Sequence, residues 1–130
     1  MKNKKITLYV VIPCYNEEEV LGETTKQLKI KLENLIKSGK ISNKSRVMYV
    51  NDGSKDNTWD EIKNINKKEK LFTGITLSRN RGHQNALLAG LMTAKDYADA
   101  VISMDADLQD DINAMDEMIE KYNNGKDIVY

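Results

Sequence analysis

Short apolar runs rich in β-branched residues recur along the chain, and stretches with helical periodicity separate them. The runs predict strands at residues 6–12, 46–51, 74–77, 100–104 and 127–130. Strands that alternate with helices are typical of a parallel sheet built from βαβ units. The hydrophobic pattern therefore predicts an α/β fold, with a Rossmann-like parallel sheet flanked by helices.

Apolar residues at helical spacing predict a helix after each of the first four strands. They are Leu21, Leu28, Leu32 and Leu35; then Trp59, Ile62 and Ile65; then the Ala and Leu residues of 84–95; and finally Ile112, Met115, Ile119 and Tyr122. Thr58 and Glu61 indicate a capping box at the start of the second helix. Pro13 is the only proline, and because it has no amide proton we expect it to end the first strand.

Composition narrows the class of protein. The chain has 130 residues, of which 40% are hydrophobic and 31% charged, so one soluble domain is expected. Lys plus Arg and Asp plus Glu both number 20, and this balance argues against nucleic acid as a partner. The longest apolar runs, 8–12 and 86–91, fall short of the ~20 residues that cross a bilayer. Cys14 is the only cysteine, which suits a reducing cytoplasm.

The most polar segments of the sheet follow the first four predicted strands. They are residues 13–18, 52–58, 78–84 and 105–111. In open parallel sheets, ligands bind beyond the carboxyl ends of the strands. The sequence therefore predicts a ligand site at that edge of the sheet.

The segment after the fourth strand contains Asp105 and Asp107, separated by one small residue. A turn after Asp105 lets both carboxylates reach one point, and two hard oxygen donors suit Mg²⁺ or Mn²⁺. The alternative is that the acidic residues only cap the following helix, a role that suits Asp110 or Asp111.

The segments after the first and second strands offer groups for a nucleoside. Asp52 directly follows a buried strand, where a carboxylate can accept hydrogen bonds from a ribose hydroxyl or a base imide. Tyr15 offers a ring that can stack on a base, and Glu17 offers a second carboxylate. The alternative for the second segment is an ordinary turn, because Asp, Gly, Ser and Asn all favour turns.

The segment after the third strand is suited to an anion such as a diphosphate. Arg79, Arg81 and Gly82 precede a helix start, where cations and free amides favour negative charge. His83, the only histidine, fits either a catalytic base or a polar residue at a helix start. We assign it no catalytic role.

Four motifs in order along the chain resemble glycosyltransferase family 2. They are residues 10–18 (VVIPCYNEE), 50–56 (VNDGSKD), 78–84 (SRNRGHQ) and 105–110 (DADLQD). Within the family, GHQ followed by ALLAGL and then DADLQD looks like the bacterial polyprenyl-phosphate glycosyltransferases, relatives of dolichol-phosphate mannosyltransferase. Two departures are Asp110-Asp111, where relatives often have Asp-Pro-Pro, and Arg81, where many have an aromatic residue.

The resemblance implies a GT-A nucleotide-diphospho-sugar transferase fold and an inverting, metal-assisted transfer to an acceptor, here a polyprenyl phosphate. The donor would be a UDP- or GDP-linked sugar, and the cofactor Mg²⁺ or Mn²⁺. The residues implied for donor binding are Pro13, Tyr15, Glu17, Asp52, Gly53, Arg79, Gly82, Asp105 and Ala106. Those implied for the metal are Asp105, Asp107 and Gln109.

The resemblance also implies that residues 1–130 are the donor-binding part of a longer domain. The acceptor-binding part and any contact with the membrane would lie beyond Tyr130, and the full protein would work at the inner face of the cell membrane. A non-catalytic nucleotide-sugar-binding module is the competing interpretation. A dinucleotide-binding oxidoreductase is disfavoured, because residues 13–18 contain no glycine.

Overall fold

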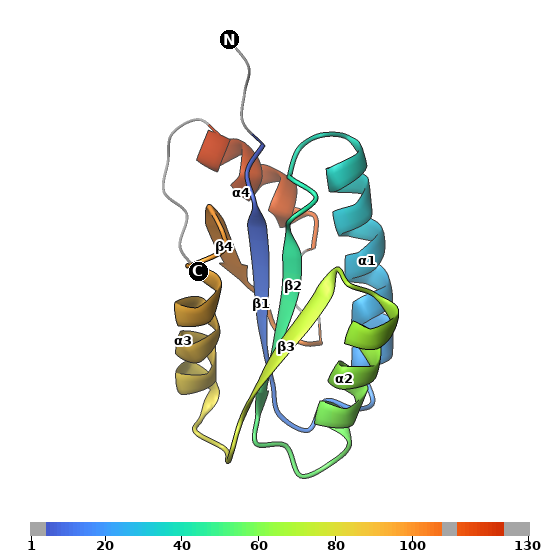
Figure 1. Cartoon of the computed structure of the whole chain (residues 1–130), viewed down its shortest axis with the longest axis vertical. Helices are drawn as coiled ribbons and strands as arrows, with labels where there is room; N and C mark the ends of the chain where they lie inside the picture. Colours follow the sequence, from blue (N-terminus) through green and yellow to red (C-terminus); the bar gives the residue numbers. More distant parts are fainter. Residues whose placement is uncertain (1–4, 108–111, 124–130) are drawn as a thin grey trace.

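The computed structural model describes residues 5–107 and 112–123, in which strands and helices alternate (Figure 1). The elements are β1 (Leu8–Cys14), α1 (Leu21–Lys37), β2 (Arg46–Asp52), α2 (Thr58–Lys68), β3 (Phe72–Leu77), α3 (His83–Ala94), β4 (Ala100–Ser103) and α4 (Ala114–Asn123). The predicted alternation of strands and helices is confirmed for these elements. The fifth predicted strand, at 127–130, lies outside the described residues.

The strands form a parallel four-stranded sheet in the order β3-β2-β1-β4. All of them run toward the lower edge of Figure 1, so their carboxyl ends meet there. The chain adds β2 and β3 on one side of β1 and then places β4 on the other side. The strand order therefore reverses between β1 and β4, and in open α/β sheets ligands bind beyond the strand ends at such a switch point.

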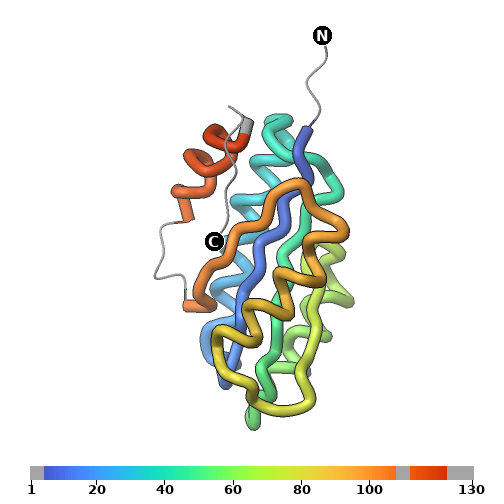
Figure 2. Tube along the Cα trace, turned by 90° about the vertical axis from the view of Figure 1, so that its left-hand side faces the viewer, coloured from blue at the N-terminus to red at the C-terminus, as the bar shows by residue number. Residues whose placement is uncertain are grey.

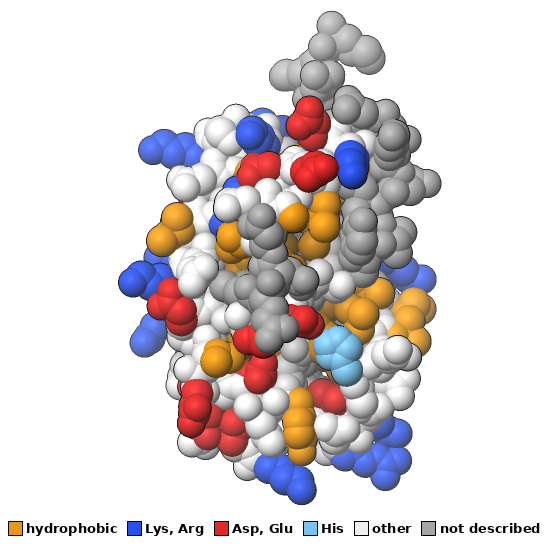
Figure 3. Space-filling model, turned by 180° about the vertical axis from the view of Figure 1, so that it is seen from behind, with side chains coloured by type: hydrophobic (Ala, Val, Ile, Leu, Met, Phe, Trp, Pro, Cys, Tyr) orange, Lys and Arg blue, Asp and Glu red, His pale blue; other side chains and the backbone are white. Residues whose placement is uncertain are grey.

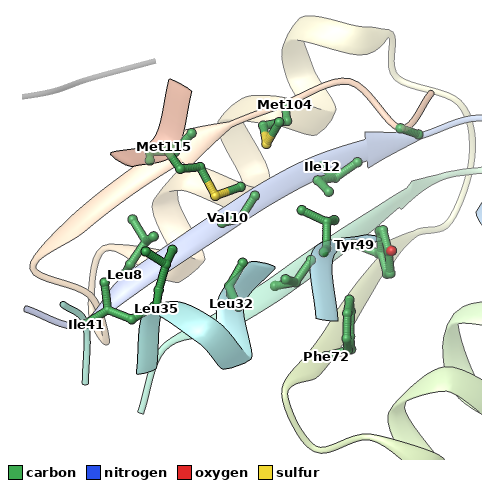
Figure 4. Packing of buried hydrophobic residues seen from close by; sticks show 14 of the residues in the cluster. Leu8, Val10, Ile12, Leu32, Leu35, Ile41, Tyr49, Phe72, Met104 and Met115 are labelled. Atoms are coloured by element: carbon green, nitrogen blue, oxygen red, sulfur yellow. The ribbon is translucent and has the colours of Figure 1, made fainter. Parts of the chain in front are cut away.

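Helices cover both faces of the sheet, but unequally. Helices α1, α2 and α4 lie on one face, and α3 lies on the other (Figures 1 and 2). Alternate residues of β1 supply the two cores, as Leu8, Val10 and Ile12 point to the first face while Tyr9 and Val11 point to the second. Figure 4 shows the first core, in which Leu32 and Leu35 of α1 pack against β1.

Helix α3 approaches the sheet closely at Gly90. A Cβ atom at this position would lie 2.4 Å from Cγ1 of Val11 and 2.8 Å from Cγ2 of Val50. Any side chain larger than hydrogen would therefore push the helix away from β1 and β2. The small residues Ala86 and Ala94 are fully buried on the same side of the helix.

Strand β1 continues past Pro13 to Cys14, so the prediction that this proline ends the strand is wrong. The main-chain oxygen of Val11 accepts a hydrogen bond from the amide of Met104, which shows that Val11 faces β4. Pro13, two residues later, faces the same side, where β4 has already ended. Its missing amide proton therefore costs no hydrogen bond within the sheet.

The predicted capping box at Thr58 is also wrong. Helix α2 does begin at Thr58, but its N-cap residue is Asn57, which makes no side-chain cap. The hydroxyl and amide of Thr58 donate instead to Oδ1 of Asp56. A contact outside the helix thus replaces the expected bond to Glu61.

In the part of the chain that the structure describes, no helix has both the length and the apolar character that a membrane crossing needs.

Candidate functional site

The loops after β1 and β2 are joined by hydrogen bonds between their main and side chains. The amide of Asn16 donates to Oγ of Ser54 (2.9 Å), and the amide of Lys55 donates to Oδ1 of Asn16 (2.8 Å). Asn16 has a positive φ of 53°, a conformation that Asn tolerates better than most residues. The two loops therefore hold each other in place.

Asp56 and Thr58 extend this connection. The hydroxyl oxygen of Thr58 accepts the amide hydrogen of Glu17 at 2.8 Å, and Oδ2 of Asp56 accepts that of Glu18 at 3.4 Å. Burial opposes ionisation of Asp56, but the hydrogen bonds from Thr58 and Glu18 outweigh it and lower the pKa of the carboxyl group. Asp56 thus serves as a charged anchor for the start of α1.

Asp52 connects the loop after β2 to the loop after β3. Its side chain is only 2% exposed, and Oδ1 accepts the amide hydrogen of Arg81 at 2.7 Å. The neighbouring Asn51 donates from Nδ2 to Oγ1 of Thr76 on β3 at 2.9 Å. The carboxylate therefore fixes the main chain just before α3.

Gly53 allows these two loops to touch. It has a φ of +64°, and a Cβ atom there would lie 2.2 Å from the main-chain nitrogen of Asn80 and 2.3 Å from the carbonyl carbon of Arg79. Real Cβ atoms do not come so close to a backbone. Glycine is thus required here both by its dihedral angle and by the space available.

A hollow of about 180 Å³ opens between the loops that follow β1, β2 and β3. Its described lining consists of Pro13, Cys14, Tyr15, Asp52, Asn80 and His83. The structure thus brings together three of the predicted donor-binding residues, Pro13, Tyr15 and Asp52. Tyr15 as a whole is 40% exposed, which leaves part of the residue available to a ligand.

Sequence reasoning missed Asn80 and Cys14 as lining residues. Oδ1 of Asn80 accepts the amide hydrogen of Gly82 at 3.0 Å, which fixes the orientation of the side chain. The thiol of Cys14 donates to the carbonyl of Ile12, and burial raises its pKa, so it stays a neutral wall of the hollow. His83, the first residue of α3, is exposed at the rim.

Acidic side chains gather beside this hollow, at the switch point between β1 and β4. Burial raises the pKa of Glu17, and the negative charges of Asp107, Asp56 and Asp105 raise it further. Figure 3 shows acidic side chains close to the histidine on this part of the surface. Carboxylates from the loops after β1 and β4 therefore lie near enough to repel one another.

The loop after β4 is anchored between its two aspartates. The hydroxyl of Thr24 on α1 donates to the carbonyl oxygen of Ala106, whose side chain is 3% exposed. Asp105 and Asp107, on either side, are exposed. Ala106 thus positions the predicted metal ligands through its main chain.

The donor set suits a hard divalent cation. Asp105 and Asp107 supply carboxylate oxygens, and the third predicted ligand, Gln109, lies outside the described residues. Among residues 5–107 and 112–123, no three His, Cys, Asp or Glu side chains meet as a ready-made metal cage. Mg²⁺ and Mn²⁺ are commonly held by one or two carboxylates, with water and phosphate oxygens completing the shell, so the residues present fit such an ion.

Two of the predicted donor-binding residues, Arg79 and Gly82, do not line the hollow. The main chain of Arg79 rests against Gly53, while its side chain is exposed. Gly82 has a φ of +93° and is the N-cap of α3, with nothing within 4 Å of a Cβ built there. The role predicted for the Arg79 guanidinium, contact with a diphosphate, stays a prediction.

A parallel sheet with a switch point and polar loops at its carboxyl edge defines a doubly wound α/β protein, a class in which ligands bind beyond the strand ends. The model of the family described as Glycosyl transferase family 2 matches residues 9–130. The chain belongs to glycosyltransferase family 2, and its fold is the GT-A fold.

Two relatives match almost the whole chain. The uncharacterized glycosyltransferase YkoT of Bacillus subtilis is 48% identical over 130 residues, which are 100% of this chain and 39% of that protein. The prophage bactoprenol glucosyl transferase homolog of Escherichia coli is 38% identical over 125 residues, or 96% of this chain and 38% of that protein. The chain therefore spans less than half the length of these relatives.

A solved structure shares the fold. It is the mannosyltransferase PcManGT from Pyrobaculum calidifontis in complex with GDP-Man and Mn²⁺, with a TM-score of 0.61 and 24% sequence identity. The match covers 80% of this chain and 28% of that chain.

Proposed function

We propose that the protein transfers a sugar from a nucleoside-diphosphate sugar to an acceptor, and that residues 1–130 hold the donor. The hollow between the loops after β1, β2 and β3 carries this proposal, because Tyr15, Asp52 and Asn80 face it together. A ring for stacking, a buried carboxylate and an amide suit a nucleoside. The GDP-Man complex of the structural neighbour supports the same class of donor.

In this proposal Pro13, Tyr15, Glu17 and Asp52 surround the nucleoside. Asp52 is already held by the amide of Arg81, so it can accept a hydrogen bond from the ligand without rearranging. Gly53 keeps the loops close enough to share one ligand. Arg79 and Gly82 lie toward the anionic part of the donor, at the start of α3.

Asp105, Asp107 and Gln109 would hold a divalent cation beside the diphosphate, and Asp105 would also lie close to the ribose. A bound cation of this kind stabilises the negative charge that develops on a leaving nucleoside diphosphate. Glu17 lies close to the two aspartates, and the repulsion among these carboxylates favours a cation there. The Mn²⁺ in the complex of the structural neighbour supports this assignment, and Mg²⁺ fits the same oxygen donors.

The acceptor in this proposal is a polyprenyl phosphate, and the anomeric carbon is inverted in a single displacement. The bactoprenol glucosyl transferase homolog, 38% identical to this chain, supports a lipid acceptor. A phosphate acceptor is already anionic at neutral pH, so the reaction needs no strong general base. Such an acceptor would place the full protein at the cytoplasmic face of the cell membrane.

Calorimetric titration of this chain with UDP and with GDP, each with Mn²⁺ and again with a chelator, tests donor binding. We expect one of the two nucleotides to bind, and to bind more tightly with Mn²⁺. Absence of binding to either nucleotide would contradict the proposal. Transfer of a radiolabelled sugar to polyprenyl phosphate by the longer protein then separates an enzyme from a non-catalytic nucleotide-sugar-binding module.

A further inference from the structure

The segment after β4 alternates between buried and exposed residues. Met104 and Ala106 lie in the first core, whereas Asp105 and Asp107 are exposed. Figure 4 shows Met104 within that core. The chain therefore presents two carboxylates at the surface, while the residue between them is anchored inside the protein.

The anchor of Ala106 lies beyond the support that the sheet gives to this segment. The pairing of β4 with β1 ends at Ser103, and the amide of Met104 donates one further hydrogen bond to the carbonyl of Val11. The carbonyl oxygen of Ala106, two residues later, accepts its hydrogen bond from the hydroxyl of Thr24 on α1. A contact across 82 residues of sequence thus continues the support where the strand stops.

Burial alone does not explain where the Thr24 hydroxyl points. Thr24 is buried, but a threonine in a helix can satisfy its hydroxyl by donating to the carbonyl four residues earlier. Thr93 in α3 does this, and its hydroxyl donates to the carbonyl of Ala89 at 2.9 Å. Thr24 donates instead to a segment outside its helix, at the residue that separates Asp105 from Asp107.

Thr24 stands on a rigid part of α1. The amides of Val20 and Leu21, at the start of the helix, both donate to the carbonyl of Glu17 at 3.1 Å. Glu17 is itself fixed, because its amide donates to the hydroxyl of Thr58 at 2.8 Å. The amide of Thr24 donates to the carbonyl of Val20 at 3.0 Å, in the same turn. The donor of the bond to Ala106 therefore belongs to a turn that other loops of the site hold in place.

We propose that the hydroxyl of Thr24 positions Asp105 and Asp107 for a divalent cation. This inference rests on the proposed function, because it takes the two aspartates as ligands of the ion. Thr24 contacts neither the ion nor the donor, and acts through the main chain of Ala106. Groups that hold metal ligands in place typically contribute about 10–100-fold to metal affinity. A bond to the residue between two ligands restrains both of them at once.

Calorimetric titration with UDP and with GDP, each with Mn²⁺ and again with a chelator, tests this role. Thr24→Val replaces the hydroxyl with a methyl group of similar size. We expect it to reduce the gain in nucleotide affinity that Mn²⁺ gives by about tenfold, and to leave the affinity in chelator unchanged. An unchanged gain, or an equal loss of affinity with Mn²⁺ and with chelator, overturns the proposal.

Two further variants separate the hydroxyl from the packing of the side chain. Thr24→Ser keeps the hydroxyl and removes the methyl group, so it should keep the gain from Mn²⁺ even though urea unfolding shows a less stable chain. Thr93→Val is the matched control, because it removes a hydroxyl that bonds within its own helix. A loss in either variant as large as that in Thr24→Val would overturn the proposal. If circular dichroism shows Thr24→Val unfolded, Thr24→Ala removes the hydroxyl without adding an atom to the core.

Electron paramagnetic resonance of free Mn²⁺ gives a second readout, because it measures how much of the ion the chain binds in the presence of nucleotide. We expect Thr24→Val to leave more Mn²⁺ free than the parent chain and Thr24→Ser do. A parent chain that binds neither nucleotide, or binds one equally with and without Mn²⁺, contradicts the proposed function and this inference together. A response to Mn²⁺ that Thr24→Val keeps in full contradicts only the role of Thr24.

Discussion

The two sides of the candidate site are built differently. On one side, the loops after β2 and β3 are locked together by the buried Asp52, the amide of Arg81 and the close approach at Gly53. On the other side, at the switch point, burial raises the pKa of Glu17, and repulsion from the exposed Asp107 and Asp105 raises it further. The main chain of the first side is fixed by contacts within the protein. The second side brings carboxylates together, and a bound cation would reduce the repulsion among them.

This difference predicts that one set of residues determines the stability of the fold and another set determines the affinity for a ligand. Changes in the locked loops should lower the free energy of unfolding, because they disturb buried contacts. Changes in the acidic group should alter ligand affinity and pH dependence with little loss of stability. Four experiments, taken from the largest expected effect to the smallest, test this separation.

Gly53→Ala should destabilise the fold most. The new Cβ would be 2.2 Å from the nitrogen of Asn80, on a residue whose φ is +64°, so a loop has to move. We expect the free energy of unfolding to fall by about 3 kcal/mol, from left-handed strain plus overpacking. Urea unfolding followed by circular dichroism measures this loss in the free energy of unfolding.

Gly39→Ala is the matched control for that change. Gly39 also has a positive φ, 80°, but the nearest atom to a Cβ there is Cε of Lys5 at 3.8 Å. Only the dihedral strain remains, so a loss of about 1 kcal/mol is expected. Equal losses in the two variants would show that the contact between the loops contributes nothing.

Asp107→Ala should remove the metal-dependent part of nucleotide binding. Loss of groups that only support a metal ligand typically costs about 10–100-fold in affinity, and loss of a ligand should cost at least tenfold. Because the side chain is exposed, the free energy of unfolding should change by less than about 0.5 kcal/mol. Calorimetry with and without Mn²⁺ measures the first effect, and Asp60→Ala on the surface of α2 is the control. An unchanged response to Mn²⁺ would remove Asp107 from the metal site.

Tyr15→Ala should weaken the binding of free nucleotide and of nucleotide sugar by the same factor. Stacking on an aromatic ring contributes about 1–3 kcal/mol per base, and the 40% exposure of the residue places the expected loss near 1 kcal/mol. Tyr15→Phe, which keeps the ring, should bind as the parent does. A loss limited to the nucleotide sugar would instead place Tyr15 beside the sugar.

Glu17 should make stability depend on pH by a small amount. Its pKa is raised in the folded chain, so the folded state holds the proton more tightly than the unfolded state. As pH rises from the ordinary pKa of a glutamate through the raised value, the free energy of unfolding should therefore fall, and only slightly, because solvent screens a partly exposed group. Urea unfolding at several pH values, with Mn²⁺ excluded, measures the change.

Glu17→Gln should reduce this decrease and leave the part that comes from Glu61, whose pKa is also raised by burial, and Glu19→Gln, an exposed neighbour, should keep all of it. The lowered pKa of Asp56 acts in a separate range, because its contribution is lost only as pH falls below the ordinary pKa of an aspartate. A decrease that is as large in Glu17→Gln as in the parent chain would assign the titration to another group.

The fold could be predicted because its signals are local. Apolar runs and helical periodicity gave the strands and helices of the described chain, with ends displaced by a few residues. Pro13 was misjudged because its effect depends on where β4 stops, at Ser103, far along the chain. The capping box at Thr58 failed because its hydroxyl donates to the local Asp56 and accepts from the amide of Glu17, which is distant in the sequence.

The candidate site could be predicted as far as strand topology determines it. Parallel strands bring their carboxyl ends together, and this places Tyr15 and Asp52 at one hollow. The sequence does not show which side chain bridges two loops, so the roles of Asn16, Ser54 and Thr24 went unnoticed. The residue type is the one signal in the sequence that could have pointed to Asn16, because asparagine adopts a positive φ more readily than most residues.

The contact at Gly90 has a consequence for how the molecule opens. Because Gly90 has no side chain, the backbone of α3 packs directly on Val11. The helix should therefore not separate from the sheet while the sheet stays folded. Its amide hydrogens and those of β1 and β2 should then exchange with solvent together, as one cooperative unit. Helix α3, whose first residue lines the hollow, should then open to solvent as rarely as the centre of the sheet does.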